Sequence, residues 1–150
     1  MNKYMTVAPG ETVSWQGSTY KVLLTAGMSG GQMGILEAVV APDFGPPRHV
    51  HRREDETFYI LSGEAIFWLD GETRTVGPGD VVFGPRGKPH TYQVIGPNPA
   101  RWITILTPGG TEAFFVEMAA GNYRFPQDIA EVTRIAARYD LEFVGPPLKP

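Results

Sequence analysis

The sequence predicts an all-β fold, a sandwich or barrel of antiparallel strands followed by a short helical segment. Its apolar stretches are only a few residues long, and the 18 glycines and 14 prolines among its 150 residues are spread between them as turn residues. No helical stretch separates the apolar stretches, as the crossovers of a parallel sheet would require. A chain of this length is expected to form one domain with a single core.

Turn signals separate the expected strands. Gln16-Gly17-Ser18 is typical of a hairpin turn, and Asp70-Gly71 is a strong hairpin signal because glycine tolerates positive φ angles. Pro42 ends the third strand because proline cannot donate a hydrogen bond to a sheet. We expect strands over residues 12–15, 20–25, 33–40, 57–61, 65–69, 73–76, 81–83, 90–95 and 101–107.

The last third of the chain differs in pattern from the rest. Thr111 is a candidate N-cap for a short helix over residues 111–120. A second, amphipathic helix is expected over residues 129–139, where apolar residues recur at helical spacing: Ile129, Val132, Ala136 and Tyr139. We expect this helix to pack on the outer face of the barrel or on a partner subunit, and residues 140–150 to form an extended tail.

The whole chain, residues 1–150, is interpreted as one domain. The barrel core is expected at about residues 12–118, and the C-terminal helix and tail at about residues 126–150. No internal repeat and no long linker divides the sequence.

Composition excludes several classes of function. With 13 basic and 16 acidic residues the net charge is -3, and no basic stripe is present for a nucleic-acid backbone. The cluster Arg48, Arg52 and Arg53 lies among Glu54, Asp55 and Glu56 and is interpreted as a solvated loop. The absence of cysteine excludes disulfides and thiolate ligands. Neither a signal peptide nor a membrane span is predicted, so we expect a cytoplasmic protein without a membrane partner.

All three histidines of the sequence belong to one pattern with a glutamate. His49 and His51 lie two residues apart, so in a strand their side chains share one face. Glu56 would point to the opposite face of a straight strand, and the charged residues 52–55 must therefore bend the chain to return it to the same site. His90 has to arrive from a separate strand, after the turn at residues 85–89.

Three imidazoles and one carboxylate predict a site for one divalent transition metal. Histidine-rich sets prefer Zn, Fe, Ni, Co, Cu or Mn over Mg or Ca. Neutral imidazoles and one carboxylate leave a net charge of about +1 on a bound dication, which favours an anionic oxygen ligand. Octahedral coordination would leave two positions for a small-molecule substrate and for water or O2. We therefore expect a Lewis-acid or dioxygen-activating enzyme.

Strand periodicity also suggests residues for a substrate pocket. Because side chains two residues apart in a strand share a face, Phe58 and Ile60 are expected to point inward with Glu56. Tyr92 and Val94 are expected to point inward with His90 for the same reason. Ordinary core packing is the alternative interpretation of these four residues. Further candidates whose facing the sequence leaves open are Met33, Ile35, Phe67 and Trp102.

Two spaced motifs resemble the signature motifs of the cupins, double-stranded β-helix (jelly-roll) barrels with a metal in the mouth. The first is His49-X-His51-X4-Glu56-X6-Gly63, and the second is Gly79-X5-Pro85-X-Gly87-X2-His90. Asp43 stands where the family has glycine and Val94 where it has asparagine, and neither position is a ligand. The motifs occur once, so the resemblance implies a single barrel with His49, His51, Glu56 and His90 as metal ligands.

Within that family, the chain looks most like one-barrel proteins related to quercetin 2,3-dioxygenase. The similar features are Gly45-Pro46-Pro47-Arg48-His49, the three-histidine, one-glutamate set, residues 108–110 and the closing segment 142–147. The resemblance implies ring-opening oxidation of a flavonol, with Glu56 as both ligand and catalytic base. It also implies a homodimer, in which the N-terminal strands and the last helix are candidates for covering exposed sheet edges.

Other functions remain open at this stage. One is a metal-dependent isomerase, decarboxylase or cyclase that acts on an enolisable acid, because similar sites support many reactions. Another is a module that senses or carries a small molecule without turnover. A serine hydrolase is disfavoured because every histidine is already assigned to the metal set.

Overall fold

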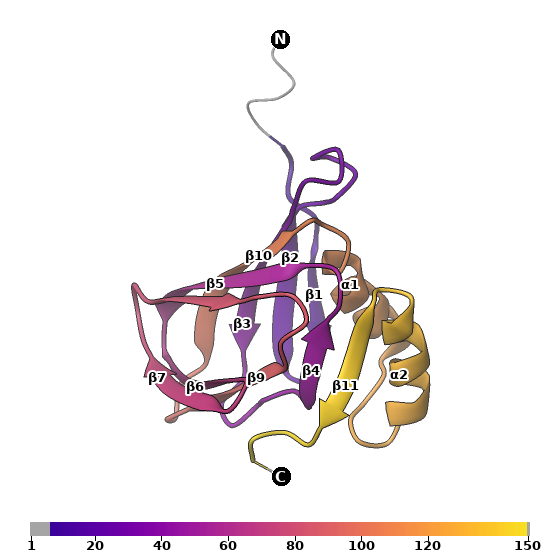
Figure 1. Cartoon of the computed structure of the whole chain (residues 1–150). Helices are drawn as coiled ribbons and strands as arrows, with labels where there is room; N and C mark the ends of the chain where they lie inside the picture. The colour runs from indigo at the N-terminus through magenta and orange to yellow at the C-terminus, as the bar shows by residue number, and fades with distance from the viewer. Residues whose placement is uncertain (1–6, 150) are drawn as a thin grey trace.

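Two antiparallel sheets face each other in the computed structural model, which describes residues 7–149 (Figure 1). The segment 1–6, which was searched for a targeting signal, and Pro150, at the end of the expected tail, lie outside the described residues. The mostly β architecture confirms the all-β barrel expected from the sequence. No helix within residues 7–149 has the length and apolar character needed to cross a membrane.

Within residues 7–149 the two sheets together contain eleven strands. The six-stranded sheet has the order β1 (Thr12–Trp15), β2 (Ser18–Leu24), β3 (Gly34–Val40), β10 (Ala100–Thr107), β5 (Asp55–Ser62) and β8 (Val81–Gly84). The five-stranded sheet has the order β11 (Leu141–Gly145), β4 (Arg48–His51), β9 (His90–Ile95), β6 (Glu64–Leu69) and β7 (Glu72–Val76). All nine expected strands are present within two residues of their predicted ends.

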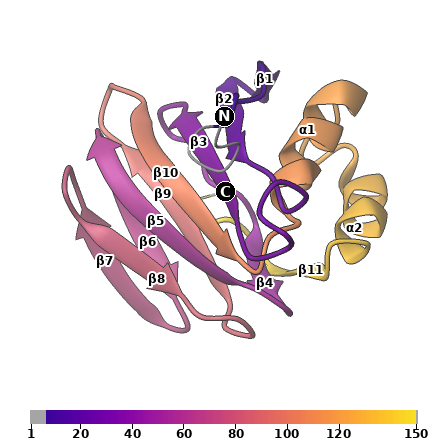
Figure 2. The same cartoon turned by 90° about the horizontal axis from the view of Figure 1, so that it is seen from above.

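The core lies between the two sheets, which face each other in Figure 2, and it consists of inward-facing residues of both. In β3 every second residue is buried, and β10 shows the same period of two. The largest fully buried side chains there include Leu36, Ile60, Trp102 and Leu106. Burying each such side chain contributes roughly 1.5–3 kcal/mol, so this double layer supplies most of the stability in a chain without disulfides.

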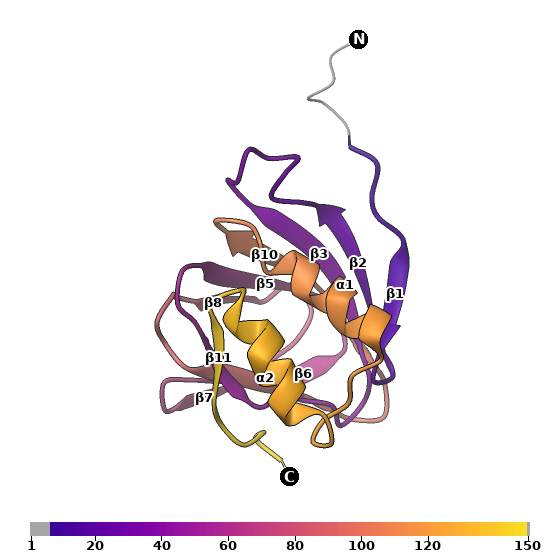
Figure 3. The ribbon, with the colours of Figure 1, turned by 90° about the vertical axis from the view of Figure 1, so that its right-hand side faces the viewer.

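Two helices lie between β10 and β11 in the sequence, α1 (Glu112–Gly121) and α2 (Ile129–Ala137). They lie across the open end between the sheets (Figure 3). α1 contacts β1, β2 and β3, whereas α2 packs on β11 and on α1 of the same chain. The stripe predicted for α2 is only partly buried: Val132 and Ala136 are inside, while Ile129 is exposed.

The expected extended tail is wrong in its first part, because Leu141–Gly145 forms β11 and pairs with β4. Apolar Leu141 and Phe143 flank Glu142, but this alternation covers too few residues to identify a strand from sequence alone. The edge of β4 would otherwise present unpaired backbone groups, and β11 satisfies them. This pairing sets Leu141 opposite His51 and Phe143 opposite His49.

Candidate metal centre

Four side chains converge at the end of the barrel that the helices cover. His49 and His51 come from β4, His90 from β9 and Glu56 from β5. One ligand atom from each residue lies within 4.8 Å of those of the others, and all four residues are buried. His49 and His90 are direct cross-strand partners, which explains why distant parts of the sequence bring two imidazoles together.

The chain changes sheets between His51 and Glu56. β4 belongs to the five-stranded sheet and β5 to the six-stranded sheet, so the intervening residues 52–54 form a corner. Glu56 therefore approaches the histidines from the opposite wall of the barrel. The bend expected from the strand period is present, and its physical origin is this crossing between sheets rather than a kink within one strand.

Each imidazole is held by its Nδ1 atom. Nδ1 lies 2.8 Å from the Pro47 carbonyl in His49, 3.0 Å from Glu54 Oε1 in His51, and 3.3 Å from the Lys88 carbonyl in His90. A carbonyl oxygen can only accept, so Nδ1 carries the hydrogen in His49 and His90. The Nε2 atoms are thereby left for the centre of the site, an arrangement typical of metal-binding histidines.

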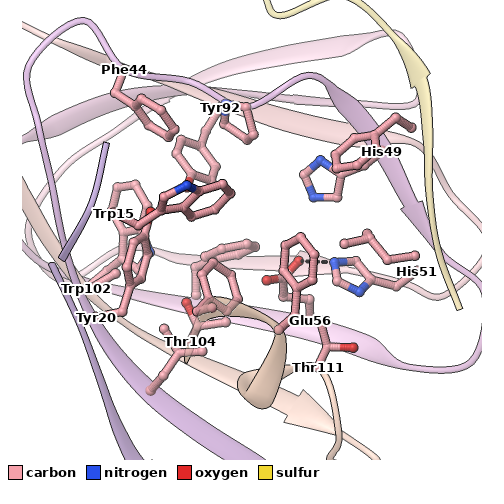
Figure 4. A pocket seen from close by; sticks show the side chains of 18 of the residues that line it. Trp15, Tyr20, Phe44, His49, His51, Glu56, Tyr92, Trp102, Thr104 and Thr111 are labelled. Atoms are coloured by element: carbon pink, nitrogen blue, oxygen red, sulfur yellow. Dashed lines mark ion pairs between the residues drawn. The ribbon is translucent and has the colours of Figure 1, made fainter. Parts of the chain in front are cut away.

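Glu56 faces these inner nitrogens directly. Its Oε2 lies 2.9 Å from His51 Nε2 and 2.8 Å from His90 Nε2. Figure 4 shows His49, His51 and Glu56 pointing toward one another at one side of a cavity. The donor set is the one group within residues 7–149 whose spacing suits a metal ion.

Charge is distributed unequally over the site. Burial, reinforced by the neighbouring histidines, lowers the pKa of His49 to about 3. Burial also lowers the pKa of His51, but Glu56 and Glu54 outweigh it and raise that pKa to about 10. Burial raises the pKa of Glu56, yet its contacts with His51 and His90 hold it well below the usual value. Without metal at neutral pH, His49 is neutral and a His51–Glu56 ion pair is buried.

Glu54 and Thr111 are site residues that the sequence did not reveal. Glu54 was assigned to a solvated loop, but only 5% of it is exposed; its neighbours Arg52 and Arg53 are exposed as expected. Thr111 Oγ1 donates a hydrogen bond to Glu54 Oε1 instead of capping α1. Thr111, Glu54 and His51 therefore form a chain that orients the His51 ring. A glutamate within a run of charged residues gives no sign in the sequence that it is buried. Glu54 is buried because the chain turns from one sheet to the other at this position.

These residues fit a divalent transition metal. Three imidazole nitrogens and one carboxylate oxygen are a preferred donor set for Zn, Fe, Ni, Co, Cu or Mn. The carbonyl and carboxylate partners of Nδ1 fix the ring orientations that such a metal would need. His51 is the ligand that must first lose a proton, because its Nδ1 and Nε2 both face carboxylates.

An apolar cavity extends from the cluster between the two sheets. Ten of its nineteen lining residues are Phe, Tyr or Trp, and its histidine and carboxylate lining comes from His49, His51 and Glu56. Aromatic walls of this kind suit a flat, largely apolar molecule.

The pocket residues suggested by the strand period fall into two groups. Phe58, Tyr92 and Trp102 line the cavity. Ile60 and Val94 are fully buried in the core and outside its lining, because a period of two indicates which face is inward but not how far along the barrel the cavity reaches. Outside the lining as well are Met33, Ile35 and Phe67, of which Ile35 lies on the alternate, less buried face of β3.

Several lining residues come from segments that the sequence did not connect with a pocket. Phe114 and Phe115 lie on α1, Phe125 lies between the helices, and Phe143 lies on β11. Phe143 packs edge-on against Phe125 at 5.6 Å between ring centroids. The C-terminal segment therefore builds one end of the cavity as well as closing the barrel.

Comparison with known proteins relates this fold and site to one family. A family model described as a cupin domain matches residues 36–106. Quercetin 2,3-dioxygenase from Bacillus subtilis is 34% identical over 67 residues, which cover 45% of this chain but only 20% of that enzyme. The uncharacterized protein MJ1618 from Methanocaldococcus jannaschii is 30% identical over 97 residues, 64% of this chain and 78% of that protein. Dimethylsulfoniopropionate lyase DddQ from Ruegeria pomeroyi is 51% identical over 45 residues, 29% of this chain and 22% of that lyase.

Solved structures resemble the chain in fold. KdgF from Halomonas sp. superposes with a TM-score of 0.61 at 19% identity, covering 69% of this chain and 92% of that one. An RmlC-like cupin from Shewanella frigidimarina gives a TM-score of 0.58 at 19% identity, covering 67% and 85% respectively. At this level of identity the similarity concerns the barrel rather than its chemistry.

Proposed function

The chain belongs to the cupin family, and we propose that it is an enzyme that holds one divalent transition metal at His49, His51, Glu56 and His90. The convergence of four buried donor groups at the end of an aromatic cavity carries this proposal. Cupin enzymes act on small molecules, and three residues of the donor set line the cavity.

The reaction we propose is oxygenation of a flavonol or a similar enolisable small molecule, as in quercetin 2,3-dioxygenase. The aromatic cavity and the relationship with the Bacillus subtilis enzyme support this choice. A bound metal would supply a Lewis acid at the cavity end and coordination positions for a substrate oxygen and O2.

The residues of the chain have distinct tasks in this reaction. Glu56 accepts at Oε the proton that the substrate hydroxyl releases. Glu54 keeps the His51 ring in place through Nδ1. The aromatic walls hold the substrate ring and exclude water, which strengthens electrostatic interactions at the donor set.

A second candidate is a reaction that needs no O2, such as an isomerase, decarboxylase, cyclase or lyase. Glu56 beside a Lewis acid could also remove a proton next to a carbonyl group. The short match with dimethylsulfoniopropionate lyase supports this class of reaction as the second candidate. A carrier or sensor that binds the same kind of molecule without turnover is the non-enzymatic alternative.

Assays with and without O2 separate these candidates. Protein purified without a histidine tag is stripped of metal, loaded in turn with Ni, Co, Mn, Fe, Cu and Zn, and incubated with flavonols. Flavonol consumption coupled to O2 uptake supports the dioxygenase. Turnover under nitrogen supports the second candidate, and tight binding without turnover for every metal contradicts both enzymes.

We also propose that the protein is a homodimer. Tyr59 on β5 and Val81 and Phe83 on β8 are exposed, apolar and adjacent at the edge of the six-stranded sheet. A second copy of the chain would cover this face. Light scattering of the purified protein measures the mass, and a monomer at micromolar concentration contradicts the proposal.

A further inference from the structure

Two sets of aromatic rings line the cavity, and each set starts at one of the site histidines. In the first set the Phe58 ring lies 6.4 Å from the His90 ring, measured between centroids. The set continues from Phe58 to Tyr92 at 6.3 Å and to Trp102 at 6.1 Å. Phe58, Tyr92 and Trp102 belong to strands of the barrel and are at most 7% exposed. We call these three residues the barrel wall.

The second set starts at His49. Phe143 is the cross-strand partner of His49, and the two rings lie 6.4 Å apart between centroids. Phe125 packs on Phe143 at 5.6 Å, and Trp15 packs on Phe125 at the same distance of 5.6 Å. All three aromatic residues line the cavity, and Phe125 and Phe143 are partly exposed. We call Phe143, Phe125 and Trp15 the outer wall, because solvent reaches two of its rings.

The outer wall is fixed in place at both of its ends. At the end near the donor set, the pairing of β11 with β4 holds Phe143. At the other end, Trp15 Nε1 donates a hydrogen bond of 2.5 Å to the Tyr123 carbonyl. The Phe125 backbone N–H donates to Gln16 Oε1 at 2.9 Å. Rings held in this way form a defined surface, as selective binding requires.

The two walls come from different parts of the chain. The barrel wall lies within residues 36–106, which match the cupin domain, whereas the three residues of the outer wall lie before and after that range. Figure 4 shows Trp15 across the cavity from His51, so the outer wall extends away from the donor set. Because one barrel supports many reactions, the segments added to it are the place where selectivity for a substrate can arise.

We propose that Phe125 and Phe143 contact the substrate and determine which substrates the site accepts. The substrate class is a flat molecule whose acidic oxygen lies at the donor set and whose further aromatic ring packs between the outer wall and the barrel wall. The proposal rests on the proposed function for the acidic oxygen and adds the ring that the site selects. A molecule without that ring gains no aromatic contact at the outer wall, so it binds less tightly.

Two ligands that share one metal-binding group test the proposal. The full chain, loaded with zinc and kept under nitrogen, is titrated calorimetrically with 3-hydroxyflavone and with maltol. Both carry a hydroxyl group next to a ring carbonyl, but maltol lacks the fused benzene ring and the phenyl ring. The ratio of the two affinities therefore measures what the additional rings contribute.

The variants Phe125→Leu and Phe143→Leu keep an apolar side chain and remove one aromatic ring each. In each variant the preference for 3-hydroxyflavone over maltol should fall about threefold to tenfold, as the loss of one aromatic pair predicts. Each variant should still bind one zinc ion per chain. Phe125 lies one ring further from His49 than Phe143 does, so Phe125→Leu tests the outer wall even where Phe143→Leu weakens zinc binding.

Val144→Ala is the matched control. Val144 neighbours Phe143 on β11 and is 45% exposed, so it lies outside the cavity lining and its replacement should keep the preference. A variant that only disturbs the metal centre weakens both ligands by the same factor and leaves their ratio unchanged. An unchanged ratio in both leucine variants therefore overturns the inference.

The proposed function fails separately from this inference. Flavonol turnover together with an unchanged ratio in both variants removes the outer wall as a selective surface and leaves the enzyme. A reduced ratio without turnover under any metal supports the outer wall and removes the dioxygenase. Failure of the unmodified, zinc-loaded protein to bind either ligand contradicts both.

Discussion

Metal binding should release a proton from His51. In the metal-free protein His51 lies between two buried carboxylates, 3.0 Å from Glu54 and 2.9 Å from Glu56, and its pKa is about 10. A metal needs the Nε2 lone pair, so binding requires deprotonation. His49 and Glu56, whose pKa values lie low, have no proton to lose at neutral pH.

The size of the effect follows from the distance between pH and pKa. At pH 7 the His51 pKa of about 10 lies three units higher, so deprotonation weakens the apparent metal affinity about 1,000-fold, or about 4 kcal/mol. The affinity should therefore rise about tenfold for each pH unit between pH 6.5 and pH 8.5.

Calorimetry and chelator competition measure this directly. Zinc titrations at pH 7.5 in buffers of different ionisation enthalpy should give at least one proton released per metal, and competition with a chelator at several pH values gives the slope. Glu54→Gln removes one of the carboxylates that raise the pKa of His51. The ratio of the zinc affinity at pH 7 to the zinc affinity at pH 8.5 should therefore be larger in this variant than in the unmodified protein. Glu142→Gln, an exposed residue of β11, is the control and should leave the slope unchanged. A pH-independent affinity with no proton release would refute a protonated His51.

Three further predictions concern stability and catalysis. The metal-free protein should lose stability as pH rises from 6.5 toward 10, because the raised pKa of His51 stabilises the folded state only while His51 is protonated. It should also lose stability as pH falls from 6.5 toward 3, because the lowered pKa of His49 keeps this residue neutral in the folded state while the unfolded chain takes up a proton. Thermal unfolding across this pH range checks both limbs, and metal-loaded protein should lack the alkaline limb. Glu56→Gln should keep the fold and part of the metal affinity but lose turnover, so unchanged activity at equal metal content would remove Glu56 from the mechanism. Gly34→Ala should destabilise the protein by about 1–3 kcal/mol in denaturant unfolding, because the new Cβ would lie 2.0 Å from the Glu112 carboxylate. That carboxylate accepts hydrogen bonds from the Ala26 and Gly110 N–H groups. Gly77→Ala is the control and should be close to neutral, because nothing lies within 4 Å of its Cβ.

Local chemistry made the strands and the donor residues predictable. The turn at Asp70-Gly71 and the period of two around Glu56 and His90 depend on neighbours in the sequence, so strand positions followed within two residues. The histidine and glutamate spacings also resemble a known pair of motifs, which brought distant residues into one hypothesis. Phe58 and Tyr92 were placed on the inward face for the same local reason.

Burial that depends on distant segments was not predictable. Glu54 belongs to a run of charged residues, and only the corner between the sheets and the hydroxyl of Thr111 make it a buried partner of His51. The sequence predicts an extended tail where β11 forms, because the open edge of β4 with which it pairs belongs to a distant segment.

The sequence by itself determined which residue types can hold a metal and that alternate residues of each strand face inward, because both depend on side-chain chemistry and local geometry. Only the tertiary structure decided the depth of the cavity and the orientation of the imidazoles. Ile60 and Phe58 share one face of β5, yet only Phe58 reaches the cavity. That difference depends on how side chains from both sheets fill the core beyond Phe58, and no local pattern carries this information.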